Sequence, residues 1–412
     1  MKTLALFLPG IFLLGMNIGT GSVTSMAKAG ATYGMDLLWA IGASCLTTFF
    51  LISIFGKFTL VTGETALQAF RKHIHPGFAI FFIVALTFGV SGSVMGVMGI
   101  VAEICFEWSK TVLNDGIAPI WWAILFTAMV YYIFWMGKTK VFERALAIIV
   151  AVMSACFLLN LFFMFPPIGD VISGMIPSIP EVKDGGDPML LIAATVGTTV
   201  FSGLFIIRTT LVKEAGWDIS HAKQQRNDAI VSATLMFIIS AAIMAAAAGS
   251  IYAEGKTMNN ASEMIAMLEP LAGQFATTLF ALGIVAAGVS SQFPNALMLP
   301  WLLCDYNNTK RDMSLNKYRI IVAVISLLGL VVPIFGGRPI LIMIVSQALN
   351  AFILPATVGG IIYLTNKTDL MKSYKNNTWV NLFLGLILAF SLFTSYLSLN
   401  GVIETISNLI NN

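Results

Sequence analysis

Charge is what this sequence lacks most. Of its 412 residues only 10% are Asp, Glu, Lys or Arg, whereas 58% are hydrophobic. An ordinary soluble domain has about 25% charged residues. This composition excludes an ordinary soluble enzyme and predicts a protein of the lipid bilayer. The 20 acidic and 23 basic residues leave a net charge of only +3, so no nucleic-acid partner is indicated.

Cysteine and histidine are also scarce, which limits metal chemistry. The four cysteines stand alone in or beside apolar segments without CxxC spacing, so neither a zinc site nor a disulfide framework is expected. The three histidines, His73, His75 and His221, lie in polar connections. Because the sequence contains no metal-ligand cluster and no nucleophile-base pair within a span, we expect no cofactor, no bound metal and no enzyme activity.

Long apolar runs fill most of the chain, and a helix of about 20 such residues crosses a bilayer. The runs are too continuous for the short alternating strands of a membrane barrel. Eleven spans are predicted, at residues 5–30, 37–56, 78–106, 116–136, 142–165, 188–212, 228–253, 273–303, 317–335, 339–364 and 378–398. They form one transmembrane domain over residues 1–412, without a soluble module.

Basic residues are distributed unevenly between the two sides of these spans. With the N-terminus in the cytoplasm, the inner connections and adjoining span ends hold 17 basic residues and the outer ones five, which leaves only Arg208 inside a span. In membrane proteins the cytoplasmic loops have the excess of Lys and Arg. We therefore predict a multi-pass protein of the cell membrane with a cytoplasmic N-terminus.

The spans divide into two comparable halves and one extra helix. Residues 5–165 and 188–364 would form inverted repeats, and residues 378–410 the additional C-terminal helix. The opening span of each half contains a run of small and hydroxylated residues near its middle, at residues 16–22 and 197–203. Such runs are poor helix formers, and paired interruptions of this kind mark the binding site of secondary transporters.

Only two charged residues lie inside a predicted span at more than two positions from its ends, where charge is costly. Arg208 follows the second interruption. One interpretation is structural: Arg208 extends toward the inner surface or forms an ion pair. The other is functional: Arg208 contacts the substrate, directly or through water. Glu103 is the only carboxylate clearly within a span. We expect Glu103 to be a proton or ion relay, or to be the ion-pair partner of Arg208.

Several motifs resemble the natural-resistance-associated macrophage protein (NRAMP) family of divalent-metal transporters, over nearly the whole chain. The resemblance rests on GATYGMDLLW at residues 30–39, KFTLVTG at 57–63, Ala102-Glu103, AAGVSS at 286–291, and Ser346-Gln347 with Leu354-Pro355. It implies an all-α integral membrane protein with about 11 helices, a five-plus-five inverted repeat and discontinuous helices 1 and 6. This is the LeuT-like architecture of the amino acid-polyamine-organocation superfamily.

The family's metal-binding motifs are altered in this chain. By alignment, its DPGN motif falls on residues 19–22 and its MPH motif on residues 201–203, so the Asp, the Met and the first His have no counterpart here. The second His of that helix becomes Arg208. Manganese and iron prefer carboxylate, imidazole or thioether ligands. The resemblance therefore identifies a transporter whose usual transition-metal cargo is not expected.

The substrate is expected at the two interruptions, and a small anion such as bicarbonate is our leading hypothesis. Backbone N–H groups at half-helix N-termini and nearby hydroxyls suit an oxyanion. The residues predicted to bind it are Gly19, Thr20, Gly21, Ser22, Thr198, Phe201, Ser202, Gly203 and Gln347. The alternative is a divalent metal cation, Mg²⁺ or Mn²⁺, held by neutral ligands, and another solute or a sensor role also stays open.

An anion imported against an inside-negative potential requires a coupling ion, and Na⁺ or H⁺ is expected. Relatives in the wider superfamily bind Na⁺ between the first and eighth helices, which implies Asn17, Ser290 and Ser291 here. Glu103 and Arg208 are the candidates for a relay. The remaining expected partner is the lipid bilayer, and we expect a monomer.

Overall fold

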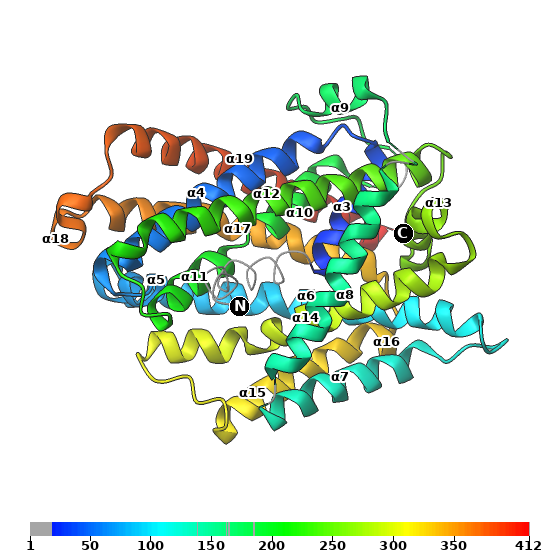
Figure 1. The fold of residues 1–412 in the computed structure, drawn as a ribbon, viewed down its shortest axis with the longest axis horizontal. Coiled ribbons are helices and arrows are strands. Elements are labelled where there is room, and N and C mark those ends of the chain that lie inside the picture. Colours follow the sequence, from blue (N-terminus) through cyan, green and yellow to red (C-terminus); the bar gives the residue numbers. More distant parts are fainter. Residues whose placement is uncertain (1–18, 138, 162, 164, 184–185, 412) are drawn as a thin grey trace.

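Helices make up the fold in the computed structural model, which describes residues 19–137, 139–161, 163, 165–183 and 186–411. Most of the long helices run side by side along the long axis of the molecule (Figure 1). In chain order the elements are α3 (Thr20–Tyr33), α4 (Leu38–Thr62), α5 (Ala66–Ala69), η1 (Phe70–Ile74), α6 (Pro76–Lys110), α7 (Pro119–Met136), α8 (Thr139–Asn160), α9 (Ile168–Gly174), α10 (Pro188–Thr199), α11 (Ser202–Glu214), η2 (Ile219–His221), α12 (Ala222–Ala247), η3 (Ala248–Tyr252), η4 (Ala261–Leu268), α13 (Glu269–Ala272), η5 (Gly273–Phe275), α14 (Ala276–Tyr306), α15 (Asn316–Leu327), η6 (Leu328–Leu330), α16 (Val331–Phe335), α17 (Pro339–Asn366), α18 (Thr368–Met371), η7 (Lys372–Tyr374) and α19 (Thr378–Asn411).

Within the described residues, nine helical segments are long and apolar enough to cross a membrane. They correspond to every predicted span except the first and the fifth. The first span, residues 5–30, lies largely outside the described residues, and its last part is α3. The fifth span is occupied by α8, whose described apolar part, Ala151–Asn160, is shorter. The division into repeats at residues 5–165 and 188–364 stays a prediction.

Local chemistry explains where several of these helices begin and end. Asp187 precedes α10 and accepts a hydrogen bond from the Met189 backbone N–H at 2.8 Å, and Pro188 occupies the first helical position. Both choices favour a helix start. At the C-terminal end of α4, Gly63 has φ = 67°. This left-handed conformation favours glycine and ends the helix.

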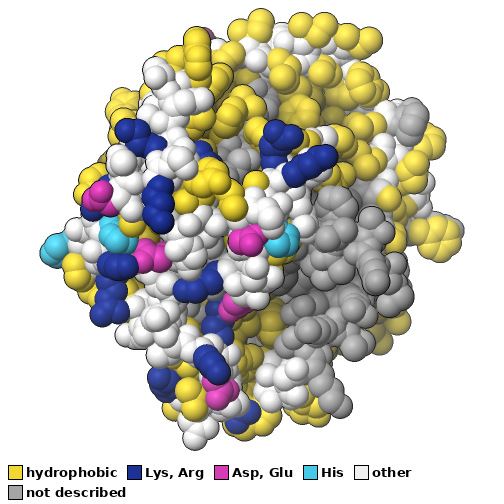
Figure 2. Space-filling model, turned by 60° about the vertical axis from the view of Figure 1, so that its left-hand side comes forward, with side chains coloured by type: hydrophobic (Ala, Val, Ile, Leu, Met, Phe, Trp, Pro, Cys, Tyr) yellow, Lys and Arg dark blue, Asp and Glu magenta, His cyan; other side chains and the backbone are white. Residues whose placement is uncertain are grey.

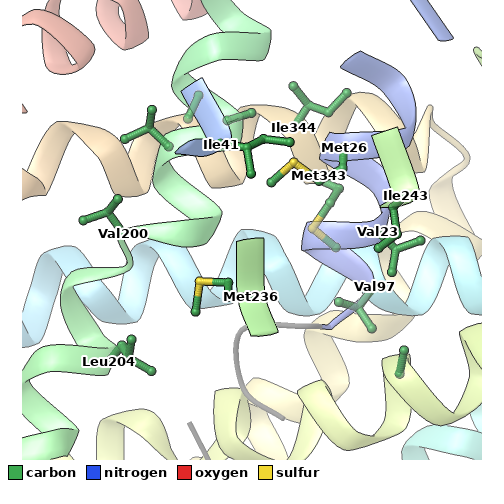
Figure 3. Packing of buried hydrophobic residues seen from close by; sticks show 14 of the residues in the cluster. Val23, Met26, Ile41, Val97, Val200, Leu204, Met236, Ile243, Met343 and Ile344 are labelled. Atoms are coloured by element: carbon green, nitrogen blue, oxygen red, sulfur yellow. The ribbon is translucent and has the colours of Figure 1, made fainter. Parts of the chain in front are cut away.

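The sixth span is broken into two helices, as predicted. Helix α10 ends at Thr199 and α11 begins at Ser202, and Val200 lies on the non-helical link between them with φ = −105° and ψ = 52° (Figure 3). In the first span, α3 begins at Thr20, directly after the extended residue Gly19. Each predicted interruption therefore coincides with the N-terminus of a helix.

A continuous apolar core surrounds α10, which packs against α3, α4, α17 and α19. Figure 3 shows buried side chains of this core from four of the helices: Val23 and Met26 of α3, Ile41 of α4, Met236 and Ile243 of α12, and Met343 and Ile344 of α17. Helices α10 and α17 come unusually close, because a Cβ on Gly197 would overlap the Gln347 carbonyl oxygen. Glycine at residue 197 is therefore required for this contact.

Basic side chains gather at one end of the molecule. Figure 2 turns toward the viewer the end where Figure 1 places α5 and α18, and Lys and Arg side chains outnumber the acidic ones on this face. Hydrophobic side chains cover much of the flanks. A charged end beside apolar flanks is the surface expected of a membrane-spanning protein.

Candidate functional site

A small cavity lies where α3 and α11 begin, and it is also bordered by α6, α14 and α17. Its volume is about 50 Å³. Since one water needs roughly 10–15 Å³ on this measure, the cavity can hold one small ion with part of its hydration shell. The described residues that line it are Gly19, Gly21, Ser22, Val90, Ser93, Val97, Thr198, Phe201, Ser291, Pro294, Asn295, Gln347 and Asn350.

Most of the residues predicted to bind the substrate meet at this cavity. Six of the nine line it, namely Gly19, Gly21, Ser22, Thr198, Phe201 and Gln347. The contact between α3 and α17 is especially close here, since a Cβ on Gly21 would lie 2.6 Å from Gln347 Nε2. The two interruptions and the tenth predicted span therefore border the same cavity.

The other three predicted binding residues do not line the cavity. The Thr20 hydroxyl faces α14, since a Cβ on Gly288 would lie 3.3 Å from Thr20 Oγ1. Ser202 Oγ accepts a hydrogen bond from Thr357 Oγ1 at 2.7 Å. Gly203 packs behind the Phe201 ring. These residues shape the helix starts and are not part of the lining.

Neutral hydrogen bonds connect the polar side chains of the lining. Ser22 Oγ lies 3.1 Å from Thr198 Oγ1, which joins α3 to α10. Gln347 Nε2 donates to Ser93 Oγ at 3.3 Å, and Gln347 Oε1 accepts from Asn350 Nδ2 at 3.3 Å. Asn350 Oδ1 is buried without a hydrogen-bond partner in the described part of the chain. This oxygen lies against Gly89 of α6, since a Cβ on Gly89 would overlap it.

The sequence analysis missed six lining residues: Val90, Ser93, Val97, Pro294, Asn295 and Asn350. Asn350 could have been found, because it lies three residues after Gln347 and so on the same face of a helix. Ser93 and Asn295 belong to α6 and α14. The rotation of these two long apolar helices about their axes depends on tertiary packing, which no local pattern fixes.

The lining is electrically neutral. None of the lining residues that the structure describes is Asp, Glu, Lys, Arg, His or Cys, and no group of three or more His, Cys, Asp or Glu suited to a metal occurs in the described ranges. A neighbouring thioether, Met343 Sδ, accepts a hydrogen bond from Gln347 Nε2 at 3.3 Å. The ligand atoms at the cavity are therefore mainly hydroxyl, amide and backbone groups.

Two helix N-termini face the cavity. Gly19 precedes α3 and Phe201 precedes α11, and both of these residues line the cavity. Neither provides a side-chain hydrogen bond to its helix. The first backbone N–H groups of a helix have no partner within it and carry the positive end of the dipole. Thr198 of α10 and Gln347 of α17 add hydroxyl and amide oxygens, so the site offers both donors and acceptors.

Arg208 does not reach the cavity. Its guanidinium forms an ion pair with Asp228 of α12, with Nη1 2.5 Å from Oδ2, and the two side chains are 0% and 1% exposed. The guanidinium also lies 5.8 Å from the centre of the Trp217 ring. The predicted pairing of Arg208 with Glu103 is thus wrong, and the structural ion pair among the alternatives is correct. Asp228 was missed as the partner because it is the first residue of a predicted span.

Glu103 has a structural contact at the end of α6. Its Oε1 accepts a hydrogen bond from the Ala261 backbone N–H at 3.0 Å, at the start of η4. Two other helices hold the same segment: Lys28 Nζ donates to the Met258 carbonyl at 2.5 Å, and Asn160 Nδ2 donates to the Met267 carbonyl at 2.7 Å. Residues 258–268 are therefore fixed by polar side chains from α3, α6 and α8.

Replacing Glu103 by glutamine is expected to lower the free energy of unfolding by only about 1 kcal/mol, because the amide oxygen can still accept from Ala261. Glu103→Ala should cost more, about 1–3 kcal/mol, because it leaves that N–H without a partner. Thermal unfolding and hydrogen exchange of residues 261–268 measure both effects. If both variants lower the free energy of unfolding equally, the hydrogen bond from Ala261 to Glu103 does not contribute to stability.

The residues predicted for a coupling ion are only partly tested. Asn17 lies outside the described residues. Ser290 and Ser291 both donate to the Ala287 carbonyl of their own helix, at 3.0 and 2.6 Å. Ser291 also lines the cavity, and the Thr20 hydroxyl, which has no partner in the described ranges, faces the same helix. Thr20 Oγ1 and the Ser291 side chain therefore both lie where α3 meets α14.

Comparison with known proteins connects this site to a family. The sequence model described as "Natural resistance-associated macrophage protein-like" matches residues 10–400. A divalent metal cation transporter, MntH, of Klebsiella pneumoniae (strain 342) is 23% identical over 369 residues, which cover 88% of this chain and 86% of that protein.

Two solved structures share the fold. The Eremococcus coleocola manganese transporter superposes with a TM-score of 0.76 at 16% identity, covering 99% of this chain and 88% of that one. Mhp1, a nucleobase-cation-symport-1 family transporter, gives a TM-score of 0.61 at 17% identity, covering 97% and 93%. At these identities the likeness concerns the fold alone, and it confirms the predicted LeuT-like helical architecture.

Proposed function

Because this chain belongs to the natural resistance-associated macrophage protein-like family, and is therefore a membrane transporter and not an enzyme, we propose that its cargo is a divalent metal cation. The cation binds at the cavity between α3 and α11 through neutral oxygens. The observation that supports this most is the uncharged polar lining, whose hydroxyl and amide oxygens come from Ser22, Ser93, Thr198, Asn295, Gln347 and Asn350.

The character of the lining favours hydrated Mg²⁺ over Mn²⁺. Mg²⁺ takes oxygen ligands and keeps several of its waters, and hydroxyl and amide groups such as those of Ser22, Ser93 and Asn295 can accept hydrogen bonds from such waters. Mn²⁺ carriers gain affinity from carboxylate and softer ligands, which the described lining does not provide. With no carboxylate ligand, the binding should be weak and the release fast.

A small anion such as bicarbonate is the second candidate. It is supported by the two helix N-termini at the cavity and by the absence of an acidic side chain from the described lining. The other ground for it is lost, because Arg208 is occupied by Asp228. The relatives named above are cation transporters, so an anion has no support from them.

Replacing Gly19 by aspartate should separate the two candidates. Gly19 has φ = −102° and ψ = −175°, which any residue can adopt, and Asp is favoured directly before a helix. If the cargo is a divalent cation, the added carboxylate should lower its Kd by about tenfold, which corresponds to about 1.4 kcal/mol. Calorimetric titrations with MgCl₂, MnCl₂ and sodium bicarbonate, and uptake into proteoliposomes, measure this.

Gly19→Asn is the matched control, since it adds the same shape without the charge and should leave the cation Kd nearly unchanged. Bicarbonate binding to the unmodified protein that Gly19→Asp abolishes, together with no detectable Mg²⁺ or Mn²⁺ binding, would reverse the ranking of the two candidates.

For coupling we propose Na⁺ in preference to H⁺, because none of the described lining residues titrates near neutral pH. Na⁺ would lie between α3 and α14, with the Thr20 hydroxyl as a ligand. Replacing Na⁺ by choline, or Thr20 by valine, should then reduce uptake on the order of tenfold, a cost of about 1.4 kcal/mol. Ser290→Ala is the control and should have little effect, because Ser290 does not line the cavity. Uptake that is unchanged in choline removes the Na⁺ proposal.

The orientation in the membrane and the oligomeric state complete the proposal. The 17 to 5 distribution of basic residues supports a cytoplasmic N-terminus in the cell membrane, and the basic end in Figure 2 would then face the cytoplasm. We also propose a monomer, because the cavity is formed within a single chain.

A further inference from the structure

Helices α7 and α15 form the least enclosed side of the molecule. Only 22% of the most apolar stretch of α7 is buried, and 33% of that in residues Asn316–Phe335, against 94% for Pro188–Glu214. Helices α7 and α15 pack against each other and lie together along the lower edge in Figure 1. In a membrane this side is exposed to lipid.

Exposed apolar side chains form a stripe along α15 that begins at a lysine. Lys317 is exposed, and Ile320, Val324 and Leu327 follow it at helical spacing with exposures of 62%, 56% and 57%. On the neighbouring end of α7, Tyr132, Trp135 and Met136 are also exposed. We call these residues, together with Arg319, the α7–α15 face. It combines a cationic end with an apolar stripe.

The cationic end is held in place by aromatic contacts. The Arg319 guanidinium lies 3.8 Å from the centre of the Trp135 ring, and Lys317 Nζ lies 4.6 Å from the centre of the Tyr318 ring. Within the ranges described, neither cation has a carboxylate partner. Arg311, in contrast, pairs with Glu214 at 3.3 Å. These two cations are therefore oriented by stacking and available to an anion.

Asp312, the acidic group that interacts with Arg319, is already hydrogen-bonded. The Asp312 carboxylate accepts hydrogen bonds from the Ser314 hydroxyl at 2.5 Å and the Ser314 backbone N–H at 3.0 Å. These bonds, and more weakly Arg319, hold the pKa of Asp312 below its usual range. Asp312 therefore stays ionised and reduces the positive potential of this end, but it leaves an excess of positive charge at Lys317 and Arg319.

We propose that the α7–α15 face binds an anionic phospholipid. The phosphate and the anionic headgroup contact Lys317 and Arg319, and an acyl chain lies along Ile320, Val324 and Leu327. A zwitterionic lipid presents its own cation to the same place, so it should bind less well. A second copy of this chain is disfavoured, because a two-fold symmetric contact through this face would oppose the same cations.

Native mass spectrometry of the purified full-length protein tests this proposal. The protein is titrated in detergent with palmitoyl-oleoyl phosphatidylglycerol or with the matching phosphatidylcholine. The first phosphatidylglycerol should bind about tenfold more tightly, as two surface cations at a membrane predict. The combined variant Lys317→Gln with Arg319→Gln should lose this preference.

Two further variants make the result decisive. Lys317→Arg with Arg319→Lys keeps the charges and should keep the preference, which excludes loss by misfolding. Lys183→Gln with Lys256→Gln removes two exposed cations elsewhere and should leave it unchanged. Equal binding of both lipids by the unmodified protein overturns the proposal. A preference for phosphatidylglycerol that survives neutralisation of Lys317 and Arg319, or that disappears in the Lys183/Lys256 control, also overturns it. The proposal is also overturned if the unmodified protein is a dimer that becomes monomeric only in the Lys317→Gln/Arg319→Gln variant, because the face would then bind a second copy of the chain.

Discussion

Replacing Arg208 by methionine is expected to lower the free energy of unfolding by about 3–5 kcal/mol, because it leaves the buried Asp228 carboxylate without its counter-charge. Both side chains are almost fully buried, so water cannot compensate. The guanidinium also contacts the Trp217 ring, and that packing is lost too. Thermal unfolding of the purified protein in detergent, followed by tryptophan fluorescence, measures the effect.

The same contact provides two controls. Arg208→Met combined with Asp228→Leu removes both charges and should restore most of the stability, since a buried ion pair can be replaced by apolar groups with little loss. Arg311→Gln removes a cation that pairs with Glu214, whose side chain is 50% exposed. This substitution should lower the free energy of unfolding by less than about 1 kcal/mol. If Arg208→Met is no less stable than Arg311→Gln, the ion pair does not hold α11 to α12.

The second large effect is expected from Gly197→Ala. A Cβ there would overlap the Gln347 carbonyl oxygen and lie 2.9 Å from the Ala351 backbone nitrogen. Backbone atoms cannot move aside alone, so α10 and α17 must separate, at a cost of about 1–3 kcal/mol. The neighbouring Thr198 and Gln347 line the cavity. Uptake of the cargo into proteoliposomes should fall on the order of tenfold or more, since binding sites tolerate displacements of only about 0.5 Å.

Gly385→Ala is the matched control for this substitution. Gly385 lies within α19, and a Cβ on it would have nothing within 4 Å. Alanine is favoured over glycine inside a helix by about 0.5–1 kcal/mol, so this variant should be as stable as the unmodified protein or slightly more stable, with unchanged uptake. Similar behaviour of the two alanine variants would contradict the close approach of α10 and α17.

The spans and their interruptions could be predicted from the sequence because hydropathy and breaks are local properties, whereas the LeuT-like architecture was implied by the family resemblance. The run at residues 197–203 contains small and hydroxylated residues, and the helix ends at Thr199 and resumes at Ser202. The positions of the helix ends were predicted less accurately. A hydropathy window stops where polar residues begin, whereas the helix continues into them. The third span, for example, was expected at residues 78–106 and extends over Pro76–Lys110.

The site was predicted in part, and the errors have a common cause. Gln347 and the two helix starts were found from motifs, but which side of α6 and α14 faces the cavity depends on how whole helices pack. Glu103 was considered as one possible partner of Arg208 because it was the only acid clearly inside a span, whereas α12 places Asp228 against Arg208. Such long-range pairing is not contained in a local pattern.

The contact between Gly21 and Gln347 restricts how this site can change over evolution. Since a side chain at residue 21 would meet Gln347 Nε2 at 2.6 Å, it could be accommodated only if the Gln347 amide moved away or residue 347 became smaller. The two positions should therefore behave epistatically, with double substitutions far from the sum of the single ones. A substitution at residue 21 would therefore change the position of the Gln347 amide, which lines the cavity, even if residue 347 itself stayed the same.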